Sequence, residues 1–195
     1  MDILAVENYI LEKLKKNLSP TLTYHGYHHT IDVAEAVLKI ASSEGIEEEE
    51  PLILLKTAAF YHDLGFITTY RGHEEESCRI ANLTLPSFGY SNPQIEKICG
   101  MIMATKIPQT PLTHLEQIIA DADLDYLGRD DFWPIAHSLY EELREREMVP
   151  NIETWNQIQV KFLSSHQYWT ASAQYWRKAK KQQYLDELCE ITKHY

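Results

Sequence analysis

The sequence predicts an all-α fold. Apolar residues recur at steps of three and four along nearly the whole chain, the spacing that gathers them on one face of a helix. No stretch shows the clean alternation of apolar and polar residues that is typical of a half-buried strand. Prolines divide the helical segments into pieces with short connections, as in packed helices. We expect a single-domain helical bundle of about eight to ten helices over residues 1–195.

The first two helices have clear boundaries in the sequence. The first is predicted to begin at Ile3 and to stop before Ser19-Pro20, because the residue before a proline resists helical backbone angles. The second is predicted over about His28–Ser43, with Gly45 beyond its end.

A run of acids, Glu47–Glu50, marks the start of a third helix, where the positive end of the helix dipole favours negative charge. That helix should end near Leu64, with Gly65 as a left-handed cap. Further helices are predicted over residues 73–85, 92–104, 113–120, 121–128, 130–147, 151–166, 168–182 and 183–194.

Composition and charge exclude several classes of protein. With 44% hydrophobic residues and few glycines and prolines, the chain can bury a core, which excludes disorder and collagen-like repeats. Eighteen Lys and Arg against 29 Asp and Glu leave a net charge of −11, so we expect neither duplex nucleic acid nor a membrane surface as a main partner.

The cysteines and the N-terminal segment favour the cytoplasm. The three cysteines form no CxxC pair, which argues against a disulfide framework and a thiolate zinc site. The N-terminus lacks the basic and apolar regions of a secretion signal. The longest apolar stretches are far shorter than the roughly 18 residues that a membrane-spanning helix needs.

Two histidines lie on apolar helix faces and predict a buried polar site. His29 shares its face with Val33, Val37 and Ile40, and His62 extends the face of Leu55, Ala58 and Ala59. Either histidine alone is more often a satisfied core residue. Asp63, however, stands at the negative end of its helix with no Lys or Arg in the flanking sequence. A divalent cation shared by His62 and Asp63 would explain both.

A cluster of aspartates provides further candidate ligands. Asp121, Asp123 and Asp125 alternate with small and apolar residues, although Asp121 could instead cap the next helix and the others could be solvated. Two histidines and two aspartates would fill four positions of a six-coordinate metal. Water or substrate oxygens would complete the shell, as a hydrolytic site needs.

The segments YHGYHHTIDVAEAV (24–37), AAFYHDLGF (58–66) and IIADADLDYLG (118–128) together resemble the HD superfamily of metal-dependent phosphohydrolases. The resemblance implies a motif core over about residues 24–131, on which C-terminal helices at 132–195 pack. It also implies that His29 is the first metal ligand and that His62 and Asp63 form the His-Asp doublet. Asp123 is the expected last ligand, with Asp121 as the close alternative.

The same resemblance suggests how a phosphate is held. GHEEES (72–77) is similar to a superfamily segment whose histidine lies near the metal or the phosphate, so His73 is expected to be an extra ligand or a second-sphere cation; the alternative is that it only begins a helix. Arg71 and Lys106 are candidate cations that offset charge on the transferred group, although Lys106 could equally be solvated. His25 is expected to line the mouth of the cleft.

The predicted reaction is hydrolysis of a phosphoester or phosphoanhydride bond, in a nucleotide or a small phosphate ester, by a metal-activated water. Asp63 is expected to orient that water as well as bind the metal. The ligand set suits one divalent ion of manganese, iron, cobalt, nickel, magnesium or zinc. The alternative is a non-catalytic, metal-holding domain that senses a nucleotide or serves a signalling partner. The oligomeric state is left open, with a homo-oligomer as one alternative.

Overall fold

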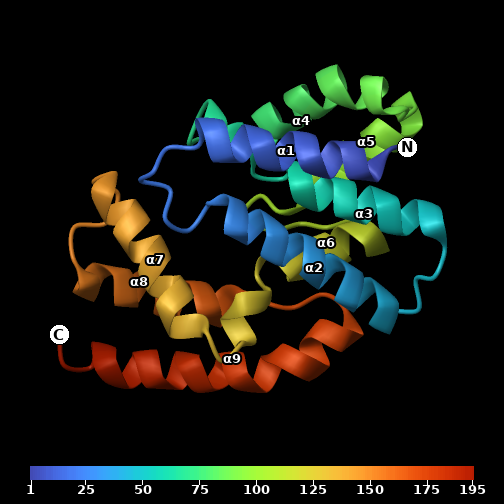
Figure 1. The fold of residues 1–195 in the computed structure, drawn as a ribbon. Helices are drawn as coiled ribbons and strands as arrows, with labels where there is room; N and C mark the ends of the chain where they lie inside the picture. The colour runs from blue at the N-terminus through green and yellow to red at the C-terminus, as the bar shows by residue number, and fades with distance from the viewer.

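The computed structural model describes residues 1–195 and consists of nine α-helices and three short 3-10 helices without any strand (Figure 1). The all-α prediction is confirmed. The α-helices are α1 (Ile3–Asn17), α2 (Tyr27–Ser43), α3 (Glu49–Tyr61), α4 (His73–Thr84), α5 (Asn92–Ala104), α6 (His114–Asp123), α7 (Phe132–Glu145), α8 (Ile152–Ser165) and α9 (Ala171–Thr192). The 3-10 helices are η1 (Leu64–Ile67), η2 (Leu85–Phe88) and η3 (Asp125–Gly128).

Two hydrophobic clusters hold the helices together. The larger contains 26 buried residues and is built by α1 to α6, with η1 and η2. The smaller contains 11 buried residues from η3, α7, α8 and α9 and from the segment before α2. In Figure 1, α7, α8 and α9 lie together beside the end of the bundle where α2 begins. Segments 24–37, 58–66 and 118–128 therefore meet close to the junction of the two clusters.

The prediction that Gly65 is a left-handed cap is wrong. The helix ends at Tyr61, and Gly65 lies inside η1 without a positive φ angle. A Cβ atom at Gly65 would lie 2.0 Å from the carbonyl oxygen of His73, so this position requires glycine because the backbone of α4 passes directly over it. Gly45, beyond the end of α2, does adopt a positive φ of 77°.

Two predicted helix divisions also differ from the structure. The predicted break after residue 120 is absent, because α6 continues to Asp123 before η3 begins. The predicted helices over 168–182 and 183–194 form the single 22-residue helix α9. No proline or glycine interrupts α9, and buried Lys181 and Tyr184 continue one face of the helix across the expected boundary.

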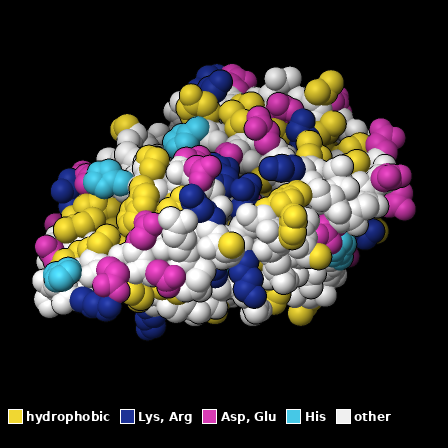
Figure 2. Space-filling model, turned by 90° about the horizontal axis from the view of Figure 1, so that it is seen from below, with side chains coloured by type: hydrophobic (Ala, Val, Ile, Leu, Met, Phe, Trp, Pro, Cys, Tyr) yellow, Lys and Arg dark blue, Asp and Glu magenta, His cyan; other side chains and the backbone are white.

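The surface over α9 mixes charges of both signs. In the view from below, basic and acidic side chains alternate with apolar ones and form no continuous basic patch (Figure 2). None of the helices has the length and low polarity that crossing a lipid bilayer would demand.

Candidate metal centre

Three helices bring side chains that are far apart in the sequence to one buried point. His29 comes from the first turns of α2, His62 from the end of α3, and Asp123 from the last residue of α6. Nε2 of His29 lies 3.1 Å from Oδ1 of Asp123 and 3.4 Å from Nε2 of His62. One ligand atom from each residue falls within 4.8 Å of the other two, so the three side chains could hold a metal ion.

Asp63 adds a fourth donor to this group. Its Oδ2 lies 3.2 Å from Nε2 of His62 and 3.5 Å from Nε2 of His29. The residue is only 5% exposed, and Oδ2 has no hydrogen-bond partner anywhere in the chain. A buried carboxylate oxygen without a partner is costly, and a cation at this point would remove that cost.

Backbone contacts orient the imidazole of His62. Its Nδ1 lies 2.7 Å from the carbonyl oxygen of Ala59, and donating to that oxygen directs Nε2 toward His29 and Asp63. The carbonyl of His62 accepts a hydrogen bond from the hydroxyl of Ser77, which in turn accepts one from the backbone N–H of Gly65. The His-Asp doublet is thus fixed to both η1 and α4.

The carboxylates in the centre are ionised at neutral pH. Burial alone would raise the pKa of Asp123, but hydrogen bonds from His29 and His62 hold it at about 2. Burial opposes ionisation of Asp63 too, yet the charge of His62 keeps the pKa of Asp63 well below its ordinary value. The pKa of His62 is raised well above its usual value by the two carboxylates, against the effect of burial. Two imidazoles and two carboxylates without a thiolate suit a divalent ion of borderline or hard character, so the residues fit a metal.

Asp121, the alternative last ligand, does not reach the centre. Its carboxylate accepts hydrogen bonds from the backbone N–H groups of Trp169 and Thr170, each at 2.8 Å, and from the Thr170 hydroxyl at 2.7 Å. These contacts tie α6 to the start of α9. Burial raises the pKa of Asp121 to about 6. The expectation that Asp121 could serve as a ligand is therefore corrected: it is a structural residue.

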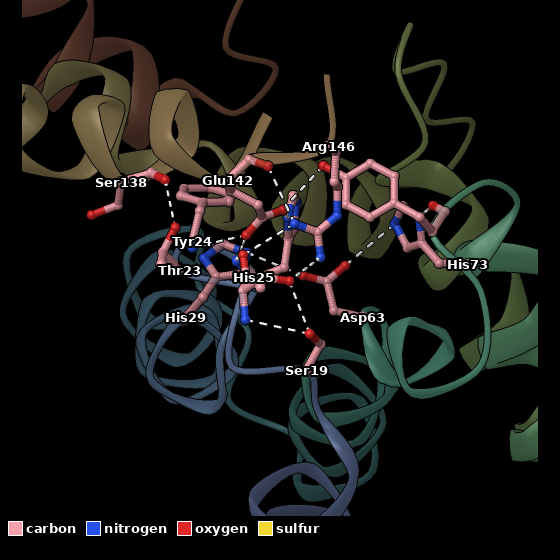
Figure 3. Close-up of polar contacts among 12 residues, drawn as sticks. Ser19, Thr23, Tyr24, His25, His29, Asp63, His73, Ser138, Glu142 and Arg146 are labelled. Carbon is pink, nitrogen blue, oxygen red and sulfur yellow. Dashed lines mark hydrogen bonds and ion pairs between the residues drawn. The ribbon is translucent and has the colours of Figure 1, made fainter. Parts of the chain in front are cut away.

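The three predicted cationic residues have different positions. His73 stacks on Phe66 with ring centroids 3.8 Å apart, and its Nε2 lies 3.4 Å from Oδ1 of Asp63 (Figure 3). Although burial opposes it, contact with Asp63 raises the pKa of His73. Lys106 instead pairs with Glu75, and Arg71 is exposed with no side-chain hydrogen bond. The structure therefore does not bring Lys106 or Arg71 to the centre.

His25 is held in the site by a residue that the sequence did not reveal. Glu142 of α7 is fully buried and accepts hydrogen bonds from the backbone N–H groups of Tyr24 and His25. Its other oxygen lies 2.5 Å from Nδ1 of His25 and 3.0 Å from the hydroxyl of Tyr70 (Figure 3). Burial alone would raise the pKa of Glu142, but the bonds from His25 hold it below its ordinary value. Glu142 is thus an anion that orients His25.

One sequence signal points to Glu142. Ile135 and Leu139 are partly buried on α7, and Glu142 follows them at steps of four and three on the same helix face. A glutamate on the apolar face of a helix is expected to be buried, and a buried carboxylate needs a hydrogen-bond or ion-pair partner. That signal does not identify the partner, because His25 lies 117 residues earlier in the chain.

A cavity of about 230 Å³ opens beside the centre. His25, Asp63, His73 and Asp123 line its polar end. Its remaining walls come mainly from α8 and η3, with Leu139 from α7. A small molecule in this cavity would have one end against Asp63 and Asp123, two of the four candidate ligands.

The fold and the site together define an all-helical protein with a buried cluster of His and Asp side chains that could hold a metal ion. The family model of the HD domain matches residues 26–125, slightly more than half of the chain, and the protein belongs to the HD domain family. HD domains bind divalent metals and are typically metal-dependent hydrolases. No curated protein and no solved structure matches the chain.

Proposed function

We propose that this protein is a metal-dependent phosphohydrolase that cleaves a phosphoester or phosphoanhydride bond of a small molecule, with nucleotides among the candidates. The observation that carries the proposal is the unpartnered Oδ2 of Asp63, buried among His29, His62 and Asp123 at the end of a cavity. A non-catalytic binding domain would need the metal ligands but not the oriented His25–Glu142 pair beside them.

His29, His62, Asp63 and Asp123 would hold one divalent ion. When bound, such an ion polarises a phosphoryl oxygen and lowers the pKa of water at the site. Asp63 contributes beyond ligation, because its Oδ1 faces His73 and fixes that ring at the rim of the centre. His73 in its protonated form is placed to offset negative charge on the transferred phosphoryl group.

We assign His25 the role of proton donor to the leaving group. The Nδ1 atom of His25 is committed to Glu142, so Nε2 is the ring nitrogen left to reach a substrate in the cavity. A buried carboxylate on one side of an imidazole fixes the orientation of the ring. In the hydrolysis the oxygen of water bonds to phosphorus, the ester P–O bond breaks, and the departing oxygen takes a proton from His25. The proton released by the attacking water then returns His25 to its starting state.

The test is a phosphatase panel measured on the purified chain after chelation and after addition of Mn²⁺ or Ni²⁺. We expect turnover only with metal, and loss of both turnover and bound metal in an Asp63→Asn variant. Asp186→Asn, an exposed aspartate on α9, is the matched control and should behave as the wild type. Full turnover in the chelated protein, or in Asp63→Asn, would overturn the proposal.

A further inference from the structure

The cavity beside the centre is predominantly apolar away from its polar end. Leu139 of α7 and four residues of α8, with Ile107 from the segment after α5, form most of that wall; the α8 residues are Trp155, Ile158, Phe162 and Leu163. A purely apolar cavity of about 150 Å³ is enough to hold a benzene molecule. At about 230 Å³ this cavity has room for an organic group of comparable or larger size next to the centre.

No Lys or Arg lines the cavity. The acids that line it are Asp63 and Asp123 in the centre and, beyond them, Glu74, which is only 7% exposed. Lys106 stands between the lining residues Thr105 and Ile107 in the sequence, but it forms an ion pair with Glu75 and does not line the cavity. The two imidazoles that line the cavity, His25 and His73, lie at its polar end beside the centre, so a second anionic group against the apolar wall would lose its hydration without meeting a cation.

Two uncharged polar side chains line the cavity, Thr105, whose hydroxyl donates to the carbonyl of Ile102, and Gln159 on the α8 wall. Gln159 is 5% exposed, and its Nε2 donates to Oδ1 of Asn156 at 3.2 Å. Asn156 is itself fixed by its bond to the hydroxyl of Tyr195. The Oε1 atom of Gln159 accepts no hydrogen bond from the chain, so it is free to accept one from a ligand.

Resting on the proposed function, we propose that the substrate is a phosphomonoester of a bulky, largely apolar alcohol. Its one phosphate lies at the metal centre and its organic group lies against α7 and α8, so that hydrolysis releases the apolar alcohol and inorganic phosphate. Nucleoside di- and triphosphates are excluded as substrates, because no Lys or Arg lines the cavity to meet a further phosphate and both lining imidazoles, His25 and His73, lie at the metal end.

Hydrolysis of ethyl, butyl and hexyl phosphate tests whether the apolar wall of the cavity binds the organic group of the substrate. They share a primary alkoxide leaving group, so differences among them report binding of the chain. We expect kcat/KM to rise at least about tenfold from ethyl to hexyl phosphate, mainly through KM. The variant Phe162→Ala, which removes part of the apolar wall, should flatten this dependence. Hydrolysis that is equal for all three esters would overturn this inference and leave the proposed function intact.

A second arm measures binding without turnover. Calorimetry on the Mn²⁺-loaded chain compares ethylphosphonate, hexylphosphonate and 6-phosphonohexanoate, which carries a carboxylate at the far end of the same chain. We expect hexylphosphonate to bind at least about tenfold more tightly than either of the others. Equal affinity of ethyl- and hexylphosphonate overturns the inference, whatever the result for hydrolysis. Preferential binding of hexylphosphonate with no hydrolysis of any ester supports apolar recognition and contradicts the proposed function.

A matched pair of variants tests whether the cavity discriminates against a second anionic group because it lacks a Lys or Arg. Ile158 lines the cavity and is 42% exposed, whereas Ile152, on the same helix, does not line it and is 39% exposed. Ile158→Arg should improve the affinity for 6-phosphonohexanoate relative to hexylphosphonate, because it supplies the missing cation. Ile152→Arg should not change that ratio. An identical ratio in Ile158→Arg, Ile152→Arg and the wild type would contradict the charge argument.

Discussion

Asp121 and Asp123 stand two residues apart on α6 and serve different parts of the molecule. Oδ1 of Asp123 lies 3.1 Å from Nε2 of His29. The carboxylate of Asp121 instead accepts hydrogen bonds from the backbone N–H groups of Trp169 and Thr170. Residues two positions apart on a helix point in directions that differ by about 200°. The same two-residue spacing thus lets one helix end contribute to the metal centre and hold the start of α9.

Substitution of these two aspartates should separate metal binding from stability. We expect Asp123→Asn to lose the bound metal with little change in the free energy of unfolding. Asp121→Ala should keep the metal but lower that free energy by about 1–3 kcal/mol, because buried N–H groups lose their acceptor. Metal content by elemental analysis and unfolding in urea measure the two effects. The reverse pattern would identify Asp121 as the ligand.

Removal of the charge of Glu142 should impair catalysis without removing metal. Glu142→Gln is expected to lower kcat by roughly tenfold to a thousandfold, because His25 loses the carboxylate that orients its ring toward the cavity. The same variant should also change the pH dependence of kcat. Glu141→Gln, at a partly exposed glutamate paired with Arg144 on the same helix, is the control. An unchanged pH profile in Glu142→Gln would mean that Glu142 has no part in proton transfer.

His166 should make the protein sensitive to acid. Its Nδ1 lies 3.2 Å from the buried ammonium of Lys181, and burial together with that charge lowers the pKa of His166 to about 3. Between pH 6.5 and 3 the unfolded chain binds a proton here that the folded chain does not, so the free energy of unfolding falls as the pH falls. The contribution of this residue is fully present above pH 6.5.

The measurement is urea unfolding at pH 7.5 and pH 5.5. The wild type should lose more stability over this interval than His166→Gln, by at most about 1.4 kcal/mol per pH unit. Equal losses in the two proteins would show that His166 titrates normally in the folded state.

Gly65→Ala should disturb the junction of η1 and α4. Its Cβ would overlap the carbonyl of His73, which is backbone and cannot move alone. We expect the free energy of unfolding to fall by about 1–3 kcal/mol or more, together with weaker metal binding, because Asp63 and His73 flank this junction. Gly100→Ala, where the nearest atom is the flexible end of Glu116, is the control. Equal stability of the two variants would contradict the role of this close approach.

Local patterns predicted much of the fold and the first ligands. Proline positions and acidic first turns placed the ends of most helices within a few residues. Helical periodicity predicted that His29 and His62 face the core. Asp63, which has no Lys or Arg beside it in the sequence, indicated a bound cation at the end of its helix. These patterns depend only on residues within one or two helical turns of each other, so they can be recognised from the sequence alone.

The remainder of the site depends on contacts between distant segments. Periodicity could not separate Asp121 from Asp123, because the choice is made by the start of α9, nearly fifty residues later. Glu142 and the apolar wall of α8 approach the motif segments only after the two clusters pack. Lys106 and Arg71 were predicted near the phosphate from their charge and their positions beside the motif segments, and the structure places neither at the centre.

In the proposed metal centre, four side chains carried by α2, by the turn after α3 and by α6 bind one divalent ion. The most direct test is elemental analysis of the chain after loading with Mn²⁺ and removal of excess metal. We predict about one ion per wild-type chain and almost none in His62→Ala. A wild-type chain without metal, or a His62→Ala variant that retains a full equivalent, would contradict the account.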